Sequence, residues 1–253
     1  FFVCCGFNSI GIVSAGGAGK VTAEWMINGE VNEDVFSLDI TRFEKFHSET
    51  NFIIDRAAES LGNQYAMHWP YKQQKTSRNI KTFPYHDLLK KEGACFGQVA
   101  GFESPLWYAI DGEKPEFKYS FGYQNWYKSA QNETINTRKN VGFFELTPFA
   151  KFEIEGEAAY SSLQYLCSND IKNNDGAITY TQMLNSKGGI EADLSVTCIS
   201  KNKFRIITGS GVREHDKKHI LRYLDQDVKF TDITDSYSCF GIFGPKSRSL
   251  LTQ

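Results

Sequence analysis

The chain of 253 residues has no apolar run close to the roughly 20 residues that a membrane-spanning helix needs. It also lacks the succession of positive, apolar and small residues that marks a signal peptide. Its formal net charge of −2 gives it no electrostatic preference for a polyanion. These absences predict a folded soluble protein with no membrane span and no nucleic-acid partner.

No C-x-x-C pair occurs among the six cysteines, and most of them lie in apolar stretches, so we expect buried reduced thiols. Cys4 and Cys5 could form a redox centre, but neighbours on a strand point to opposite faces, which favours simple packing. His68 and His86 have no Cys, Asp or Glu at ligand spacing. The sequence therefore predicts no metal site, and we expect both histidines to be exposed or hydrogen-bonded.

The chain is too long for one ordinary core, so two or three cores or parts of cores are expected. It opens on Phe1 and Phe2 without an initiator Met, and it closes on Leu250 and Leu251, which resemble the first turn of a helix. Both ends look cut. The sequence predicts an α+β multidomain fragment.

Glycines punctuate the first 30 residues. An apolar strand over 2–13 is expected to lead into a glycine-rich turn over 14–20 and then a helix over 21–27, which ends at Asn28-Gly29. Such a turn offers free N–H groups at the positive end of a helix to a cofactor. The G-x-G-x-x-G spacing is absent, so tight helix-to-strand packing explains the glycines equally well.

The rest of the chain has a clearer pattern. A helix is expected over 53–61, followed by an irregular aromatic and basic stretch to which we assign no chemistry, and by a loop over 111–127. Beyond it, the periodicity predicts strands over 149–155, 177–184, 190–199, 204–208, 228–233 and 237–243, and helices over 157–167 and 212–224. The segment 185–189 is a hairpin turn with glycines where positive φ is needed.

An ordered series of motifs over more than 40 residues resembles the closing segment of the flavin domain in dimethylglycine and sarcosine dehydrogenases. The motifs are Gly6-Phe7-Asn8-Ser9-Ile10-Gly11, Ala15 to Lys20, Ala23 to Met26, Gly29, Asp39-Ile40 and Arg42-Phe43. The resemblance implies that FAD contacts Gly6, Phe7, Asn8, Ser9, Ile10 and Gly11, with Gly16 and Gly17 behind them. A helix N-terminus there would stabilise negative charge on the reduced flavin. The family's dinucleotide fingerprint and amine-facing residues would lie before Phe1.

The middle segment resembles the central domain of the same family, through motifs at 65–70, Arg78, 93–97 and 101–105. The predicted domains are therefore residues 1–48, the C-terminal end of an FAD-dependent oxidoreductase (DAO-like) domain, and 49–106, its central domain. Residues 107–253 are predicted to be the N-terminal part of an aminomethyltransferase folate-binding domain.

The sharpest motifs belong to this last part, which resembles the glycine-cleavage aminomethyltransferase fold. They are 141–152, 168–171, Tyr180-Thr181-Gln182-Met183-Leu184-Asn185 and Gly188-Gly189-Ile190 ending in Asp193. The resemblance implies that Tyr180, Thr181, Gln182 and Met183 bind tetrahydrofolate and that Asp193 is the catalytic carboxylate. Relatives carry two consecutive acids where this chain has Ala192-Asp193, and Glu191 is a weaker substitute.

The hairpin itself supports a shared site, because it sets Tyr180 and Asp193 on adjacent strands. A pterin ring could pack on Tyr180 while Asp193 exchanges a proton with folate nitrogens. On local sequence alone, a solvated acid beside a turn is the favoured interpretation of Asp193, by roughly three to one. His215-Asp216 resembles half of a hydrolase triad but lies in a helix pattern without a nucleophile elbow, so a surface pair is expected.

Together these resemblances imply an FAD- and tetrahydrofolate-dependent enzyme that demethylates an N-methyl amine of the dimethylglycine or sarcosine class. Its electron acceptor would be an electron-transfer flavoprotein or oxygen. Its location would be cytoplasmic in a bacterium or the mitochondrial matrix in a eukaryote. The alternative is a non-catalytic regulatory relative that resembles the pyruvate dehydrogenase phosphatase regulatory subunit.

Overall fold

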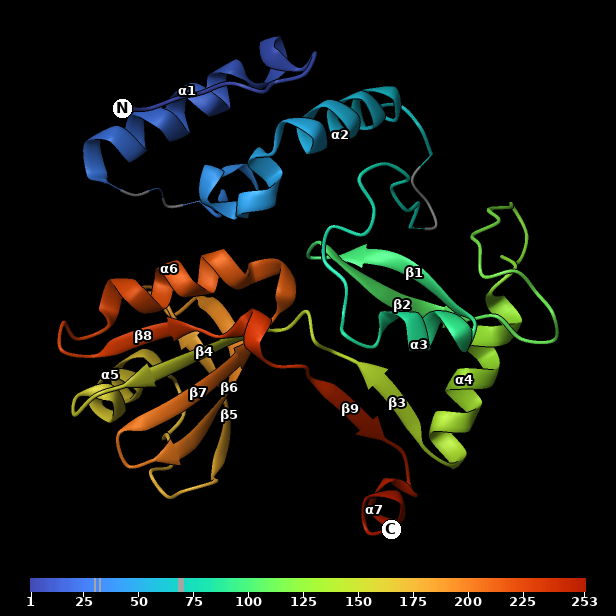
Figure 1. Ribbon diagram of the computed structural model, residues 1–253. Helices are drawn as coiled ribbons and strands as arrows, with labels where there is room; N and C mark the ends of the chain where they lie inside the picture. Colours follow the sequence, from blue (N-terminus) through green and yellow to red (C-terminus); the bar gives the residue numbers. More distant parts are fainter. Residues whose placement is uncertain (30, 32, 68–70) are drawn as a thin grey trace. The chain divides into compact units, whose positions relative to one another are not determined.

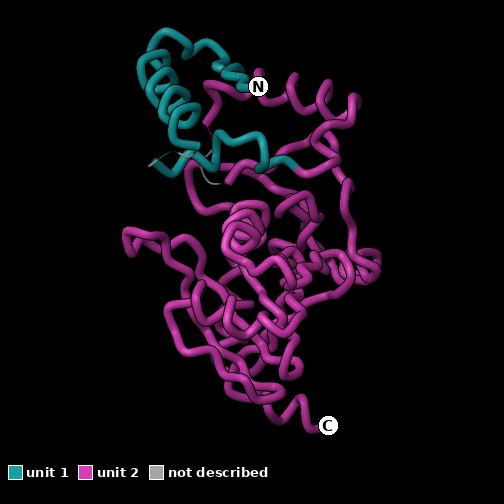
Figure 2. Tube along the Cα trace, turned by 90° about the vertical axis from the view of Figure 1, so that its left-hand side faces the viewer, with its two compact units in different colours: residues 1–43 teal, residues 44–253 magenta. Residues whose placement is uncertain are grey.

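The computed structural model describes residues 1–29, 31, 33–67 and 71–253, and these form two compact units, Phe1–Phe43 and Glu44–Gln253 (Figures 1 and 2). His68, which bore on the metal question, lies outside the described residues. None of the helices formed by described residues is long and apolar enough to cross a membrane.

The first unit consists of the helix α1 (Gly11–Asn28) and two short 3-10 turns, Phe36–Leu38 and Ile40–Arg42. The predicted stop at Gly29 is confirmed, because this residue adopts φ 76° and its N–H donates to the carbonyl of Trp25 at 2.9 Å. The predicted strand over 2–13 and glycine-rich turn over 14–20 are wrong. Positive φ falls earlier, at Gly6, Asn8 and Ser9, so the chain turns there and the later glycines are helical.

The second unit begins with a 3-10 turn, Lys45–Ser48, and the helix α2 (Thr50–Gly62), which confirms the helix predicted over 53–61. The short helix α3 (His86–Lys91) then precedes an antiparallel hairpin of β1 (Ala94–Val99) and β2 (Phe102–Tyr108). Its tight turn uses Ala100 at φ 49° and Gly101 at φ 80°, the paired positive values that match the twist of a two-residue hairpin.

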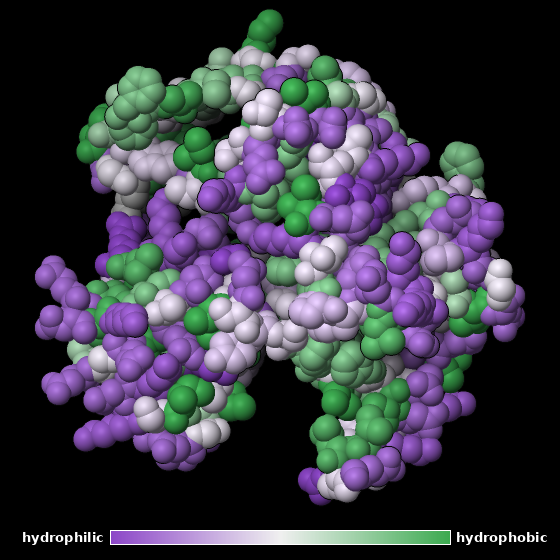
Figure 3. Space-filling view, viewed as in Figure 1, coloured by the Kyte–Doolittle hydropathy of each residue, from purple (hydrophilic) through white to green (hydrophobic). Residues whose placement is uncertain are grey.

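A polar helix and a small two-stranded sheet come next. The helix α4 (Tyr127–Lys139) occupies residues beyond the predicted loop and was not anticipated. The strand β3 (Gly142–Glu145) pairs antiparallel with β9 (Phe240–Phe243), and the helix α7 (Ser247–Leu251) follows. Apolar side chains gather on the surface here, including Phe143 at 56 % and Phe243 at 52 % exposure (Figure 3).

The main core lies under a five-stranded antiparallel sheet in the order β5-β6-β7-β4-β8. Its strands are β4 (Ala150–Glu155), β5 (Ile178–Leu184), β6 (Ile190–Ser200), β7 (Lys203–Thr208) and β8 (Lys229–Asp232). The helices α5 (Ala159–Leu166) and α6 (Arg213–Tyr223) contribute Leu163 and Ile220 to the same core cluster. The expected strand and helix order of this part is confirmed.

The cysteines match the expectation only in part. All six are free thiols; Cys95, Cys167 and Cys198 are buried, and Cys239 is half-buried. Burial raises the pKa of the Cys167 thiol to about 12 and that of Cys95 to about 11, so both are inert at neutral pH. Cys4 and Cys5 are exposed rather than packed, because the strand that would have buried one of them does not form.

Candidate functional site

The β5–β6 hairpin carries the predicted folate residues, and strict alternation divides its side chains between two faces. Tyr180 and Asp193 lie on the exposed face, whereas Thr181, Met183 and Leu194 are at most 2 % exposed and point into the core. The exposed face therefore offers a tyrosine ring and a carboxylate. Thr181 and Met183 could meet a ligand on that face only through their backbone.

Asp193 is the acceptor at the centre of this face. It pairs directly with Gln182 across the ladder, and Tyr180 lies diagonal to it. The Tyr180 hydroxyl donates to Asp193 Oδ2 at 2.8 Å, and Gln182 Nε2 donates to Oδ1 at 3.3 Å. The pKa of Tyr180 is raised because its hydroxyl donates to this carboxylate, an interaction that a phenolate would lose. Tyr180 and Asp193, which the sequence predicted to lie on adjacent strands beside one site, are thus in direct contact.

The loop after α5 holds the outer strand of the sheet in place. The Asn169 side chain donates to the carbonyl of Tyr180 at 2.7 Å, and the Asn169 N–H donates to Thr181 Oγ1 at 3.1 Å. The Ser168 N–H also donates to the carbonyl of Gln182 at 2.8 Å. Because β5 is an edge strand, these bonds fix the backbone beneath Tyr180 and Gln182.

Glu191 does not share the environment of Asp193. A register shift lies between Met183 and Leu184, opposite Glu191, so the alternation is interrupted there. Glu191 accepts a hydrogen bond from the Asn185 side chain at 2.9 Å, and its other oxygen lies 3.2 Å from His215 Nε2. Its carboxylate is therefore engaged by the turn and by α6.

His215 and Asp216 are not the expected surface pair. Asp216 is fully buried and accepts a hydrogen bond from the Thr208 hydroxyl, while its other oxygen lies 2.9 Å from His215 Nδ1. Local sequence could not show this, because Thr208 of β7 meets Asp216 only in the folded chain. Neither Asn185 nor His215 was assigned a site role from the sequence.

The predicted flavin residues all lie in the first unit. Gly6, Phe7, Asn8, Ser9 and Ile10 form the turn before α1, where the Ile10 N–H donates to the carbonyl of Phe7 at 2.9 Å. Gly11 is the first residue of the helix, so this turn does stand at a helix N-terminus.

Gly16 and Gly17, by contrast, lie inside α1 rather than in a turn before it. A Cβ built on either would meet no atom within 4 Å. A flat ring could therefore approach the helix surface closely at these positions.

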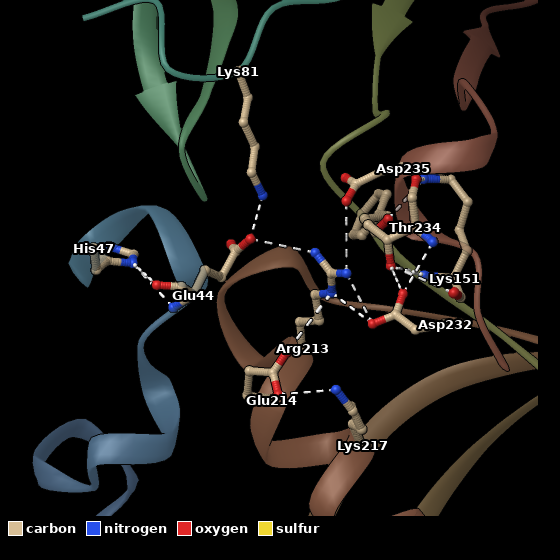
Figure 4. Close-up of polar contacts among 11 residues, drawn as sticks. Glu44, His47, Lys81, Lys151, Arg213, Glu214, Lys217, Asp232, Thr234 and Asp235 are labelled. Atoms are coloured by element: carbon tan, nitrogen blue, oxygen red, sulfur yellow. Dashed lines mark hydrogen bonds and ion pairs between the residues drawn. The ribbon is translucent and has the colours of Figure 1, made fainter. Parts of the chain in front are cut away.

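Charged side chains form a second polar cluster around Arg213, the first residue of α6 (Figure 4). Its guanidinium lies 2.9 Å from Asp232 and 3.4 Å from Glu44, and Glu44 also pairs with Lys81. Burial raises the pKa of Asp232, but hydrogen bonds from Thr234 and Arg213 outweigh it and hold the pKa below its usual value. This cluster ties the segment at Glu44 to α6 and β8.

Nearby, Lys151 is 2 % exposed and has a structural rather than a catalytic environment. Its amine donates to the carbonyls of Thr147, Phe149 and Thr234 at 2.8, 2.9 and 3.2 Å. Burial lowers the pKa of this amine. All three of its protons are used in joining β4 to the neighbouring loops.

No group of histidine, cysteine or acidic side chains suited to a metal ion occurs among the described residues. His86 is neither exposed nor hydrogen-bonded through Nδ1, which is buried without a partner, and its ring packs on Phe96 at 4.2 Å between centroids. The hydrogen bond expected for this half-buried histidine is missing at Nδ1, where the ring packs on an aromatic side chain instead.

Two family models match the chain: the FAD dependent oxidoreductase central domain over residues 28–82 and the GCVT N-terminal domain over residues 85–253. These ranges overlap the predicted domains, whose boundaries at 48 and 106 stay a prediction.

The relatives that match the whole chain include three with different names. They are 4-methylaminobutanoate oxidase (formaldehyde-forming) of Paenarthrobacter nicotinovorans, 38 % identical, the mitochondrial pyruvate dehydrogenase phosphatase regulatory subunit of Mus musculus, 32 %, and mitochondrial dimethylglycine dehydrogenase of Rattus norvegicus, 31 %. The chain spans about a third of their length, 31, 30 and 30 % respectively.

Among solved structures, the glycine cleavage system aminomethyltransferase T of Bartonella henselae matches with a TM-score of 0.56 and 23 % identity. The match covers 68 % of this chain and 43 % of that one. It supports the fold of the larger unit.

Proposed function

The chain belongs to the family of GCVT N-terminal domains, and a match to an FAD dependent oxidoreductase central domain precedes this part, so we propose that the chain is part of a one-carbon transfer enzyme. The whole protein oxidatively demethylates an N-methyl amine of the dimethylglycine or sarcosine class with FAD. It then passes the one-carbon unit to tetrahydrofolate.

The observation that carries the folate half of this proposal is the exposed Asp193 with two donors aimed at it. Tyr180 and Gln182 fix both carboxylate oxygens, so a carboxylate with a defined orientation stands beside an aromatic ring that is 62 % exposed. The ring suits packing against a flat pterin, and the carboxylate suits proton exchange with a ring nitrogen. Tetrahydrofolate, when bound, would supply the nitrogen that captures the carbon.

The flavin half rests on the turn at 6–10 and on α1. The N-terminus of this helix begins at Gly11, and the surface at Gly16 and Gly17 is open enough for a flat ring. Backbone N–H groups at a helix start stabilise negative charge. FAD, when bound, would accept the hydride from the amine, while this chain contributes only part of the wall around it.

The alternative function is regulatory, because the chain is 32 % identical to a phosphatase regulatory subunit across its whole length. A regulatory relative would keep the sheet and its core but would not need an oriented acid on the exposed face. The arrangement of Asp193, Tyr180 and Gln182 favours the enzyme.

The test uses the full-length protein that contains this chain. We expect it to be yellow, with a flavin absorbance band, and to reduce an electron acceptor when given an N-methyl amine. Dimethylglycine, sarcosine and 4-methylaminobutanoate should be compared, with the corresponding unmethylated amino acids as controls. A colourless protein without amine-dependent reduction would favour the regulatory alternative.

A further inference from the structure

A continuous chain of polar contacts runs from the buried side of the sheet to the β5–β6 turn. The Thr208 hydroxyl donates to Asp216, which contacts His215 at 2.9 Å, and His215 contacts Glu191 at 3.2 Å. Glu191 accepts from Asn185 at 2.9 Å. Each contact fixes the next, so the helix α6 is connected to the hairpin through an imidazole.

Hydrogen bonds to the side chain and backbone of Asn185 hold the β5–β6 turn together. Its side-chain oxygen accepts the N–H groups of Lys187 and Gly189, both at 2.9 Å, and its own N–H donates to the carbonyl of Gly189 at 2.9 Å. The amide nitrogen that remains is the one that donates to Glu191. The orientation of Asn185, and hence the turn, therefore depends on where Glu191 is held.

The imidazole of His215 has a carboxylate oxygen at each nitrogen, Asp216 at Nδ1 and Glu191 at Nε2. A neutral imidazole carries one N–H and one lone pair, so it can donate to only one of the two. Both contacts are attractive only when the ring carries two protons. The link between Glu191 and α6 is thus complete in the imidazolium form.

The two carboxylates favour a positive charge on the ring, and they act against the dipole of α6. His215 stands in the first turn of α6, where the helix dipole disfavours a cation. Titratable groups that face it include Glu191 from β6, and Asp216 and His219 from its own helix. Burial lowers the pKa of His219, which favours the neutral form of that neighbour and reduces its repulsion of an imidazolium at His215.

The position of Glu191 matters for Asp193, two residues further along β6. The ladder shifts register between Met183 and Leu184 and is regular again where Gln182 opposes Asp193. A bulge can slip unless a side chain fixes it, and a slip by one residue would turn Asp193 to the other face. The contact between His215 and Glu191 therefore lies at the point where the register of the hairpin is set.

We propose that protonated His215 is a positioning residue that clamps Glu191 and the β5–β6 turn, and thereby holds Asp193 and Tyr180 in their geometry on the exposed face. This role rests on the function proposed for Asp193. When the ring loses a proton at higher pH, one of its two carboxylate contacts is lost and the turn loosens.

The first test needs neither folate nor amine. Hydrogen exchange at the amides of Lys187 and Gly189 is measured in the full-length protein from pH 6 to pH 9, after correction for intrinsic exchange. We expect protection to fall about tenfold over this range, the change that corresponds to one pKa unit of coupling. In H215Q, whose amide can donate to Glu191 but cannot titrate, protection should not change with pH.

The matched control is K218Q, which removes a positive charge from an exposed position of the same helix. It should keep the pH dependence of the parent. If H215Q retains that dependence too, the proposal is overturned. If H215Q fails to fold, an NMR pH titration of the parent protein replaces it. A shared midpoint for the His215 ring and the turn amides supports the clamp, whereas separate midpoints reject it.

The second readout is methylene-tetrahydrofolate formation against pH. The parent should lose kcat on the alkaline side at the midpoint seen by exchange, and H215Q should lack that limb. Absence of methylene-tetrahydrofolate formation in every variant would reject the proposed function, while the exchange experiment would still decide the clamp.

Discussion

At the scale of single residues, Asp193 owes its orientation to two neighbours rather than to burial. Tyr180 and Gln182 each occupy one carboxylate oxygen, and the side chain stays on the exposed face of the sheet. Asparagine would keep the size and one acceptor but remove the negative charge and the capacity to take a proton.

We expect D193N to slow methylene-tetrahydrofolate formation by about 100-fold to 10,000-fold, the range for loss of a general acid–base group. Amine oxidation should be unchanged, because that chemistry belongs to the flavin half. Single-turnover folate assays and flavin reduction, followed separately, measure the two steps. D175N, at an exposed acid of the same unit, is the control, and an equal loss of both activities in D193N would refute the assigned role.

At the scale of elements, α1 has two kinds of glycine, one at its C-terminal end and the other within the helix. Gly29 ends the helix at φ 76°, where an L residue is strained, whereas Gly17 lies within the helix with no atom near its missing Cβ. The first glycine is required by backbone conformation, and the second is not.

We expect G17A to stabilise α1 by about 1 kcal/mol, because alanine loses less backbone entropy on entering a helix. G29A should destabilise it by about 1–2 kcal/mol. Hydrogen exchange of the α1 amides in flavin-free protein checks both. If the glycine exists for flavin approach, G17A should also weaken FAD binding in the full-length protein; unchanged FAD affinity would remove Gly17 from the contact set.

The elements that the sequence predicted correctly are those with a local signal. Alternation along β5 and β6 and the glycines of the 185–189 turn predict the hairpin, and this also brought Tyr180 and Asp193 together. By contrast, α4 buries only Ser129 and has no apolar stripe to reveal it. The role of His215 could not be predicted from the sequence, because its partners Glu191 and Asp216 lie on different elements and meet only in the folded chain.

At the scale of the whole molecule, its larger unit depends on carboxylates that stay ionised in low-dielectric surroundings. Burial raises the pKa of Glu103, but hydrogen bonds from Arg78 and the Asn79 N–H outweigh it, so the pKa lies below its usual value. The pKa of Asp232 is lowered in the same way by Thr234 and Arg213.

A carboxylate with a depressed pKa contributes stability above its unfolded value, about 4, and loses that contribution as pH falls through its folded value. We therefore expect the urea midpoint of the larger unit to be level from pH 7 to pH 5 and to fall between pH 4 and pH 2. The double variant E103Q/D232N should have a lower midpoint at pH 7 and a flatter acid limb. A parent midpoint that does not change down to pH 2 would contradict this expectation.

The two faces of the hairpin make its chemistry and its folding mutationally independent. Thr181, Met183 and Leu194 carry the core, while Tyr180, Gln182 and Asp193 alternate with them and contribute little to it. Substitutions on the exposed face can therefore change the site without changing the buried residues of the core. The two relatives that match this chain from end to end have named roles as different as a dehydrogenase and a phosphatase regulatory subunit, and a core that does not depend on the exposed set is compatible with both.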